Sequence, residues 1–188
     1  VVTGSVNQGC VESGTSDYVK QVLAETAMAD VTMAPCADMF EVGAKVEVIK
    51  KKTMYAQNAQ RLYEYYVKYP SFDDIPAADR DRIEKKILKD SFDNIWKGTK
   101  AYFSRMDPSK IPQAERNPKM KMALVSRWYL GNSSRWAVQG DPDRKFDMQI
   151  WCGQAMGAFN LWVKGTPMEK AENRHVGEVA KLLLNSCA

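Results

Sequence analysis

The first eight residues constrain this chain most, because they predict a strand for which the sequence supplies no partner strands. Residues 1–8, VVTGSVNQ, have the pattern of a buried strand that runs into a glycine turn. A helical pattern with N-cap chemistry follows at Thr15-Ser16-Asp17. Strand, turn and helix make one β/α unit, and no second such unit appears. A single unit cannot close a sheet, so we expect this segment to be irregular, or to pair with another chain or a local hairpin partner.

The rest of the chain predicts helices, because apolar residues recur at helical spacing. The helical segments are 17–23, 54–69, 76–88, 92–103, 122–138, 150–162 and 169–184. Gly131 is expected to break or bend its helix, and residues 29–40 are expected to form an irregular, buried connection around Pro35. Residues 46–49 fit either an extended or a helical conformation. The sequence therefore predicts a mainly α fold, a helical module of about six to seven helices with at most one or two short strands.

Composition places the chain among ordinary globular proteins and argues against two kinds of partner. Its 188 residues suffice for one domain with a sizeable core, and 45% are hydrophobic and 27% charged. The net charge of +4 is spread along the chain, whereas nucleic-acid binding needs a localised basic stripe, so we expect no nucleic-acid partner. No apolar run approaches the ~20 residues that cross a bilayer, so we expect no transmembrane segment. Peripheral association with a membrane complex stays compatible with the sequence.

The titratable residues predict neither a metal site nor a catalytic group in this chain. Cysteines stand at positions 10, 36, 152 and 187 without a C-x-x-C pair, which argues against zinc and favours reduced thiols in the cytosol or an organelle stroma or matrix. The single histidine, His175, lies on the last predicted helix, far from the glycine turn. The pairs Asp73/Asp74 and Asp141/Asp143 lie in loops beside prolines, where capping is the ordinary role.

Two places in the sequence could bind an anion. At the first turn, the backbone N–H groups of Gly4 and Ser5 can point at a phosphate, and the Ser5 hydroxyl can add a donor. A plain tight turn is the ordinary alternative. The second place is the run of Arg127-Trp128 and Arg135-Trp136, which could hold an anion or stack on a flat ligand. Its alternative is buried tryptophans with arginines that pair with acidic neighbours.

Four long blocks of the sequence carry a family resemblance. They are TGSVNQGCVESGTSDYVKQVLAE, ADVTMAPCADMFEVGAKVEVIKKKTMY, KMALVSRWYLGNSSRWA and IWCGQAMGAFNLWVKG. Together they closely resemble the C-terminal part of the PfaD-type enoyl reductases of polyunsaturated fatty acid synthases and polyketide assembly lines. These reductases are similar to the nitronate monooxygenase (2-nitropropane dioxygenase-like) flavoproteins. The resemblance covers residues 1–165 and fades at Thr166.

The resemblance implies a division of the chain and a cofactor. Residues 1–53 would be the remnant of the final β/α unit of an FMN-binding TIM barrel and its connection, with residues 1–5 as the last strand. Residues 54–165 would be the helical extension of the family, and residues 166–188 a terminal helix outside the match. Thr3, Gly4 and Ser5 correspond to the turn whose backbone amides hold the FMN phosphate, which requires the barrel to be present. No catalytic role transfers to Arg127 or Arg135.

What the chain lacks limits what it can do alone. A TIM barrel takes about 250 residues, and its other strands have no counterpart here. Hydride transfer needs the flavin ring held against the substrate in a dry pocket, so we expect the chain alone to bind no cofactor and to be inactive.

Two functional hypotheses stay open. The chain is a non-catalytic structural or binding subunit of a larger, organellar or membrane-associated assembly, or it is the C-terminal fragment of an active FMN-dependent enoyl reductase. The additional terminal helix favours the first hypothesis, and the retained TGSVNQ turn favours the second. Other protein subunits are the expected partners.

Overall fold

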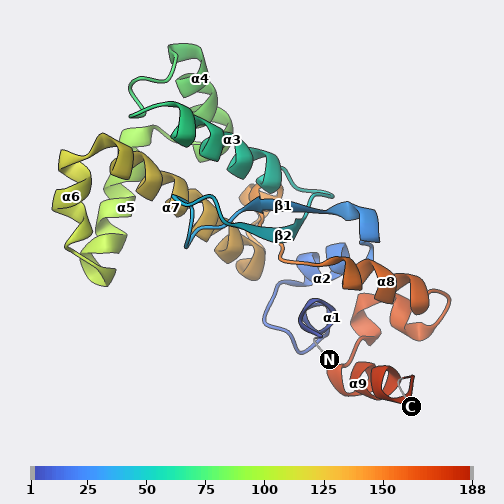
Figure 1. The fold of residues 1–188 in the computed structure, drawn as a ribbon. Coiled ribbons are helices and arrows are strands. Elements are labelled where there is room, and N and C mark those ends of the chain that lie inside the picture. Colours follow the sequence, from blue (N-terminus) through green and yellow to red (C-terminus); the bar gives the residue numbers. More distant parts are fainter. Residues whose placement is uncertain (1–2, 187–188) are drawn as a thin grey trace. The chain divides into compact units, whose positions relative to one another are not determined.

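The computed structural model describes residues 3–186 and has the mainly α fold that the sequence predicts (Figure 1). Two short strands, β1 (Val31–Pro35) and β2 (Lys45–Ile49), pair in a two-stranded sheet. The α-helices are α1 (Gly4–Gln8), α2 (Asp17–Ala24), α3 (Tyr55–Lys68), α4 (Ala77–Arg82), α5 (Phe92–Met106), α6 (Lys110–Arg116), α7 (Pro118–Gln139), α8 (Gln154–Trp162) and α9 (Val176–Asn185). A π-helix (Ile83–Leu88) follows α4, and 3₁₀ turns lie at Met28–Asp30, Pro142–Asp147, Pro167–Glu169 and Ala171–Asn173.

The described residues form two compact units. The first comprises the residues up to Met33, Val46–Ala56 and those from Ser133 onward, and the second comprises Ala34–Lys45 and Gln57–Asn132. Within residues 3–186, no helix combines the length and the apolar character needed to cross a membrane.

The core of the first unit joins α1, α8 and α9, which lie near one another in Figure 1. Val6 of α1, Phe159 of α8 and Val179 of α9 are buried in one cluster. On α8, Gly157 lies so close to the 3₁₀ turn Met28–Asp30 that an added Cβ would stand 2.1 Å from the Met28 nitrogen. Only glycine permits this approach between two backbones.

The prediction of a strand at residues 1–5 is wrong for residues 3–5, which the structure describes. Val1 and Val2 lie outside the described residues, and helix α1 begins at Gly4 with Thr3 as its N-cap. As a helical residue, Val6 reaches the buried cluster of the first unit. Among residues 3–186, no strand lies beside this segment to bond its backbone, so helix formation satisfies groups that a lone strand would leave unpaired.

Residues 29–49 are more regular than expected. The predicted irregular connection contains β1, and the segment left undecided at residues 46–49 is extended within β2. Pro35 is the last residue of β1, a position where its missing N–H interrupts no ladder. Beyond the strands, the Cys36 N–H donates to the Ala44 carbonyl at 3.0 Å. The local pattern predicted an irregular connection around Pro35, but the proline instead ends strand β1.

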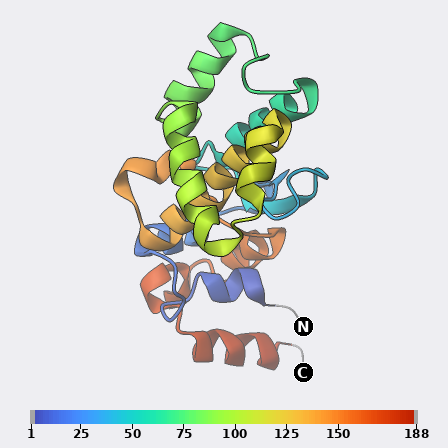
Figure 2. The same ribbon diagram turned by 90° about the vertical axis from the view of Figure 1, so that its left-hand side faces the viewer.

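The second unit contains the predicted helices 76–88 and 92–103, most of 54–69 and the first part of 122–138. Phe40 packs against two tyrosines of α3, with ring centroids 5.5 Å from Tyr63 and 5.2 Å from Tyr66. Figure 2 shows α5 and α6 side by side. Of the break or bend expected at Gly131, the break is wrong, because α7 runs without interruption from Pro118 to Gln139. A Cβ at Gly131 would meet nothing within 4 Å, so this glycine marks no close approach.

The terminal helix begins later than expected. Residues 169–175 belong to 3₁₀ turns and a connection, and α9 starts at Val176. The connection contains Arg174, which is only 1% exposed. Its Nε donates to the Met168 carbonyl at 2.8 Å and its Nη2 to the Glu169 carbonyl at 3.2 Å. These bonds tie the Arg174 side chain to the backbone of the connection that precedes α9.

Candidate functional site

Thr3, Gly4 and Ser5 lie at the N-terminus of α1, where the sequence had predicted a glycine turn. The first intrahelical bond runs from the Asn7 N–H to the Thr3 carbonyl at 2.9 Å. The N–H groups that precede this bond have no carbonyl within the helix to donate to, which is the general property of a helix start. Gly4 is exposed, and an added Cβ there would meet nothing within 4 Å. The backbone donors expected for a phosphate are therefore present, in a different local structure.

The Ser5 hydroxyl joins this turn to α8. Its Oγ accepts a hydrogen bond from the Gly153 N–H at 3.0 Å, which leaves the hydroxyl proton for donation. Glu47 of β2 lies on the same side, because a Cβ built on Gly153 would stand 3.0 Å from Glu47 Oε2 and 3.5 Å from Ser5 Oγ. The backbone and hydroxyl donors fit a phosphate group. The exposed Glu47 carboxylate opposes an anion there.

Cys152 lies beside this turn but does not carry a reactive thiolate. Burial, and to a smaller extent the Glu47 carboxylate, raise the pKa of its thiol to about 12. The thiol donates to the Gly153 carbonyl at 3.3 Å. Since the thiolate is the nucleophilic form, Cys152 is inert at neutral pH.

This burial predicts how Cys152 reacts. At pH 8 we expect a thiol reagent to label Cys152 only after unfolding in urea, as measured by mass spectrometry of the labelled peptide. Because the folded-state pKa exceeds the unfolded value, this thiol also makes stability fall as the pH rises above about 8.5. Rapid labelling of the native chain at pH 8 would contradict both statements.

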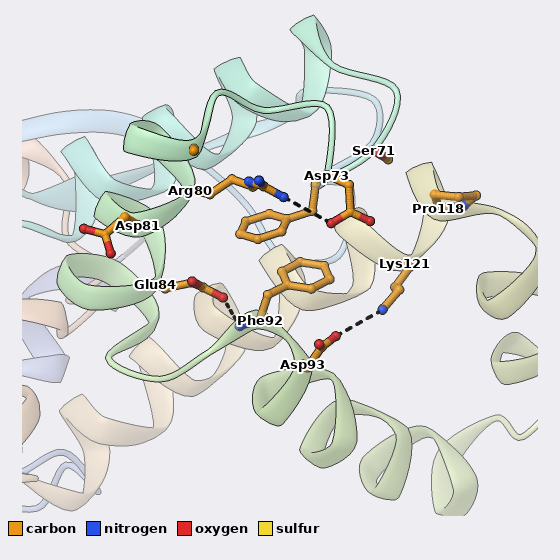
Figure 3. Close-up of a pocket in the computed structure, with 11 residues that line it drawn as sticks. Ser71, Asp73, Arg80, Asp81, Glu84, Phe92, Asp93, Pro118 and Lys121 are labelled. Atoms are coloured by element: carbon orange, nitrogen blue, oxygen red, sulfur yellow. Dashed lines mark hydrogen bonds and ion pairs between the residues drawn. The ribbon is translucent and has the colours of Figure 1, made fainter.

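The second unit contains an open cavity of about 480 Å³, shown in Figure 3. Two buried rings, Phe72 and Phe92, lie in its wall, stacked 4.0 Å apart and 11° from parallel. Glu84 fixes the start of α5 there, since its Oε1 accepts the Phe92 N–H at 2.6 Å. The residues that form this cavity come from the 69–76 linker, α4, the π-helix, α5 and α7. Sequence reasoning missed it because no local pattern shows that Pro118 and Lys121 of α7 lie beside residues 71–93.

Two ion pairs line the same cavity. Arg80 Nη1 lies 3.4 Å from Asp73 Oδ1, and Lys121 Nζ lies 3.6 Å from Asp93 Oδ1 (Figure 3). Both carboxylates are largely exposed, so these pairs contribute little to stability. Among the described residues that line the cavity, none is a histidine or a cysteine. The cavity can receive a polar molecule. Ser71 in its wall donates a hydrogen bond to Asp74 Oδ2 at 2.6 Å.

The two Arg-Trp pairs belong to different units and have different surroundings. Arg127 Nη1 bonds Glu41 Oε1 at 3.2 Å, as the alternative of arginine paired with acid predicted. Arg135 is exposed, and the buried Trp136 is covered by Arg144, whose Cζ lies 4.3 Å from a ring centroid.

The remaining candidates have structural roles. His175 is exposed, and its Nδ1 lies 3.1 Å from Glu12 Oε1. A hydrogen bond from the Val176 N–H is the main cause that lowers the pKa of Glu12. Asp141 accepts the Asp143 N–H at 3.0 Å, which is the predicted capping role. Cys10, Cys36 and Cys152 are buried free thiols, and Cys187 lies outside the described residues. Within residues 3–186, no cluster of acidic, histidine or cysteine side chains could hold a metal ion.

Comparison with known proteins identifies several relatives of the chain. Residues 69–148 match a family model described as "[Acyl-carrier-protein] S-malonyltransferase, inserted helical domain". The chain is 48% identical over 171 residues to a polyunsaturated fatty acid synthase protein of Thraustochytrium sp.. It is 44% identical over 188 residues to the polyketide biosynthesis protein PksE of Bacillus subtilis. In fold it matches the crystal structure of the enoyl reductase domain of MlnA, from the macrolactin biosynthesis cluster of Bacillus amyloliquefaciens, with a TM-score of 0.90 and 37% identity over 96% of the chain.

These matches cover only part of each relative. The chain spans 11% of the Thraustochytrium protein, 24% of PksE and 40% of the MlnA chain. They confirm the expected similarity to proteins of polyunsaturated fatty acid and polyketide synthesis. The malonyltransferase description was not expected from the sequence. The PksE alignment spans the whole chain and so includes residues 166–188, which the resemblance had left out.

Proposed function

We propose that this chain is the C-terminal part of a PfaD-type, FMN-dependent enoyl reductase and supplies its phosphate-binding turn and helical module. The observation that carries this proposal is the match to the MlnA enoyl reductase domain, with a TM-score of 0.90 at 37% identity. A shared fold alone does not transfer an activity, so the proposal also depends on the donors at the start of α1.

Thr3, Gly4 and Ser5 would hold the FMN phosphate in this proposal. In TIM barrels a phosphate site commonly lies after the last strands, at the N-terminus of a short extra helix. The five-residue α1 fits this description, and its first N–H groups and the Ser5 hydroxyl fit the phosphate oxygens. When bound and reduced by NADPH, FMN would supply the hydride that reduces an enoyl group. The residues of this chain bind and orient its phosphate end, and the walls around the flavin ring come from a barrel.

A hybrid domain tests the proposal. In it, this chain replaces the matching 40% of the MlnA enoyl reductase domain. We expect the purified hybrid to hold FMN near one molecule per chain by flavin absorbance, and the 188-residue chain alone to be colourless. A folded hybrid that takes up no FMN would contradict the proposal.

Two substitutions should move the FMN affinity of the hybrid in opposite directions. Ser5→Ala removes a hydroxyl donor and the bond from Gly153, so we expect the dissociation constant to rise about tenfold. Glu47→Gln removes a negative charge beside the turn and should lower that constant. Ser13→Ala is the control, because its hydroxyl bonds the Gln8 carbonyl instead. Titration of flavin fluorescence measures all three, and unchanged affinity in Ser5→Ala would remove Ser5 from the site.

A non-catalytic subunit is the second candidate, and the organisation of the chain favours it. Each of the two units buries apolar residues of its own, and the family model matched by residues 69–148 describes an inserted helical domain. Such a subunit would be isolated without flavin and in constant ratio with other synthase proteins. Flavin in the native complex, bound to this chain, would exclude it.

A further inference from the structure

Helix α5 carries two sets of residues at helical spacing, one buried and one exposed. Its inner side is buried in the second unit through Phe92, Ile95, Trp96, Thr99 and Phe103. A second set follows the spacing i, i+3, i+4, i+7 and i+8 and is exposed: Gly98, Ala101, Tyr102, Arg105 and Met106. We call these five residues the α5 outer stripe. This spacing places them on one side of the helix, which is the pattern of a seam that packs against another helix.

The α5 outer stripe combines exposed apolar side chains with small residues. Tyr102 is 50% exposed and Met106 is 66% exposed. A Cβ added at Gly98 would meet nothing within 4 Å, so nothing in the described part of the chain requires glycine there. Glycine nevertheless weakens a helix interior relative to alanine. Gly98 and Ala101 leave room beside Tyr102 for a second helix to approach closely.

The same side of α5 carries cations and, after its first turn, no carboxylate. Lys97 and Arg105 are exposed, and in the described part of the chain neither forms an ion pair. Asp93 is the one acidic residue in the sequence of α5, and it pairs with Lys121 beside the cavity. The Lys97 ammonium donates only to the neutral Asn94 Oδ1, at 3.2 Å. Both cations can therefore attract carboxylates of a partner.

The other polar side chains on this side of α5 are bonded locally. Asn94 Nδ2 donates to Asp90 Oδ1 at 3.0 Å, and Ser104 Oγ donates to the Lys100 carbonyl at 2.8 Å. A membrane surface would need bulky apolar side chains along the whole stripe, and a nucleic acid would need a longer row of cations. A narrow stripe of small and apolar residues with two cations fits an acidic amphipathic helix better than either.

We propose that the α5 outer stripe docks an acidic amphipathic helix of a partner protein. The apolar side of that helix packs against Tyr102 and Met106. Its carboxylates bind Lys97 and Arg105. The inference is independent of the flavin, because no residue of α5 belongs to the proposed phosphate turn.

A peptide titration of the 188-residue chain tests this surface. The probe is a peptide of about 20 residues, long enough for a helix, built from Glu, Ala and Leu with the leucines on one side. Its matched control has Gln in place of every Glu. On addition of the Glu peptide, amide NMR shifts should change at residues 97–106, and the Gln peptide should bind about fivefold more weakly. Equal binding of the two peptides, shifts confined to other residues, or no saturable binding up to about 1 mM peptide would overturn the inference.

Paired variants separate the charged contacts from the apolar ones. Lys97→Glu combined with Arg105→Glu should weaken binding of the Glu peptide about tenfold and leave the Gln peptide unaffected. Lys164→Glu combined with Lys170→Glu is the control, because both side chains are exposed in the first unit and the net charge changes equally. It should bind the Glu peptide as the parent chain does. Tyr102→Ala should weaken both peptides alike. Tighter binding to phosphatidylserine vesicles than to the Glu peptide, lost in the Lys97 and Arg105 variant, would assign the surface to lipid and overturn the inference.

Discussion

Replacing the buried Arg174 with methionine should destabilise the chain by about 3 kcal/mol, because two backbone carbonyls lose a charged donor. The guanidinium bonds the Met168 and Glu169 carbonyls and lies 5.4 Å from the ring centroid of Phe159. Burial lowers the pKa of Arg174, yet an arginine stays charged at neutral pH. Methionine fills part of the volume but can satisfy neither carbonyl.

Urea denaturation followed by circular dichroism measures this loss. Arg174→Lys should recover only part of it, because an ammonium does not reproduce the planar fork of the guanidinium. Arg135→Met is the matched control on exposed α7 surface and should change stability by less than about 0.5 kcal/mol. If Arg174→Met unfolds at the same urea concentration as the parent chain, the guanidinium does not hold this turn.

Gly157→Ala should cost about 3 kcal/mol, because the new methyl group has no room. An added Cβ would lie 2.1 Å from the Met28 nitrogen and 2.4 Å from the Ala27 carbonyl carbon. Both are backbone atoms, so relief requires α8 to move away from the 3₁₀ turn. The thermal midpoint should fall by about 6–12 °C for a chain of this size.

The control for this substitution is Gly177→Ala in α9. A Cβ there would meet nothing within 4 Å, and alanine favours a helix over glycine by about 0.5–1 kcal/mol. We therefore expect Gly177→Ala to raise the midpoint slightly while Gly157→Ala lowers it. An unchanged midpoint in Gly157→Ala would mean that the two backbones do not lie in contact.

Local sequence patterns correctly predicted the helices whose starts depend on neighbouring residues alone. The helix from Asp17 begins as expected because Ser16 Oγ accepts the Val19 N–H. The predictions are wrong where contacts with residues distant in the sequence determine the conformation. Residues 4–8 are helical because Val6 packs against Phe159 and Val179, and nothing near Val6 in the sequence shows these contacts. The start of α9 was misplaced as well, and no local pattern shows that the buried Arg174 side chain bonds the backbone of the preceding connection.

The candidate site could also be predicted only in part from local sequence. Thr3, Gly4 and Ser5 are neighbours in sequence, so their grouping could be predicted from it. Gly153 and Glu47 join them only through the fold, and no local pattern links those positions to the turn. The cavity beside Phe72 and Phe92 was missed because stacked aromatic rings look, in a sequence, like any other core residues.

The most direct test of the central claim is NADPH-dependent reduction of a 2-enoyl thioester, measured with added FMN for the 188-residue chain alone and for the hybrid domain. We predict turnover by the hybrid and none by the chain alone, because the chain supplies the phosphate end of the flavin site and a barrel supplies its walls. Turnover by the chain alone, or a hybrid loaded with FMN that does not reduce the thioester, would contradict this division of roles.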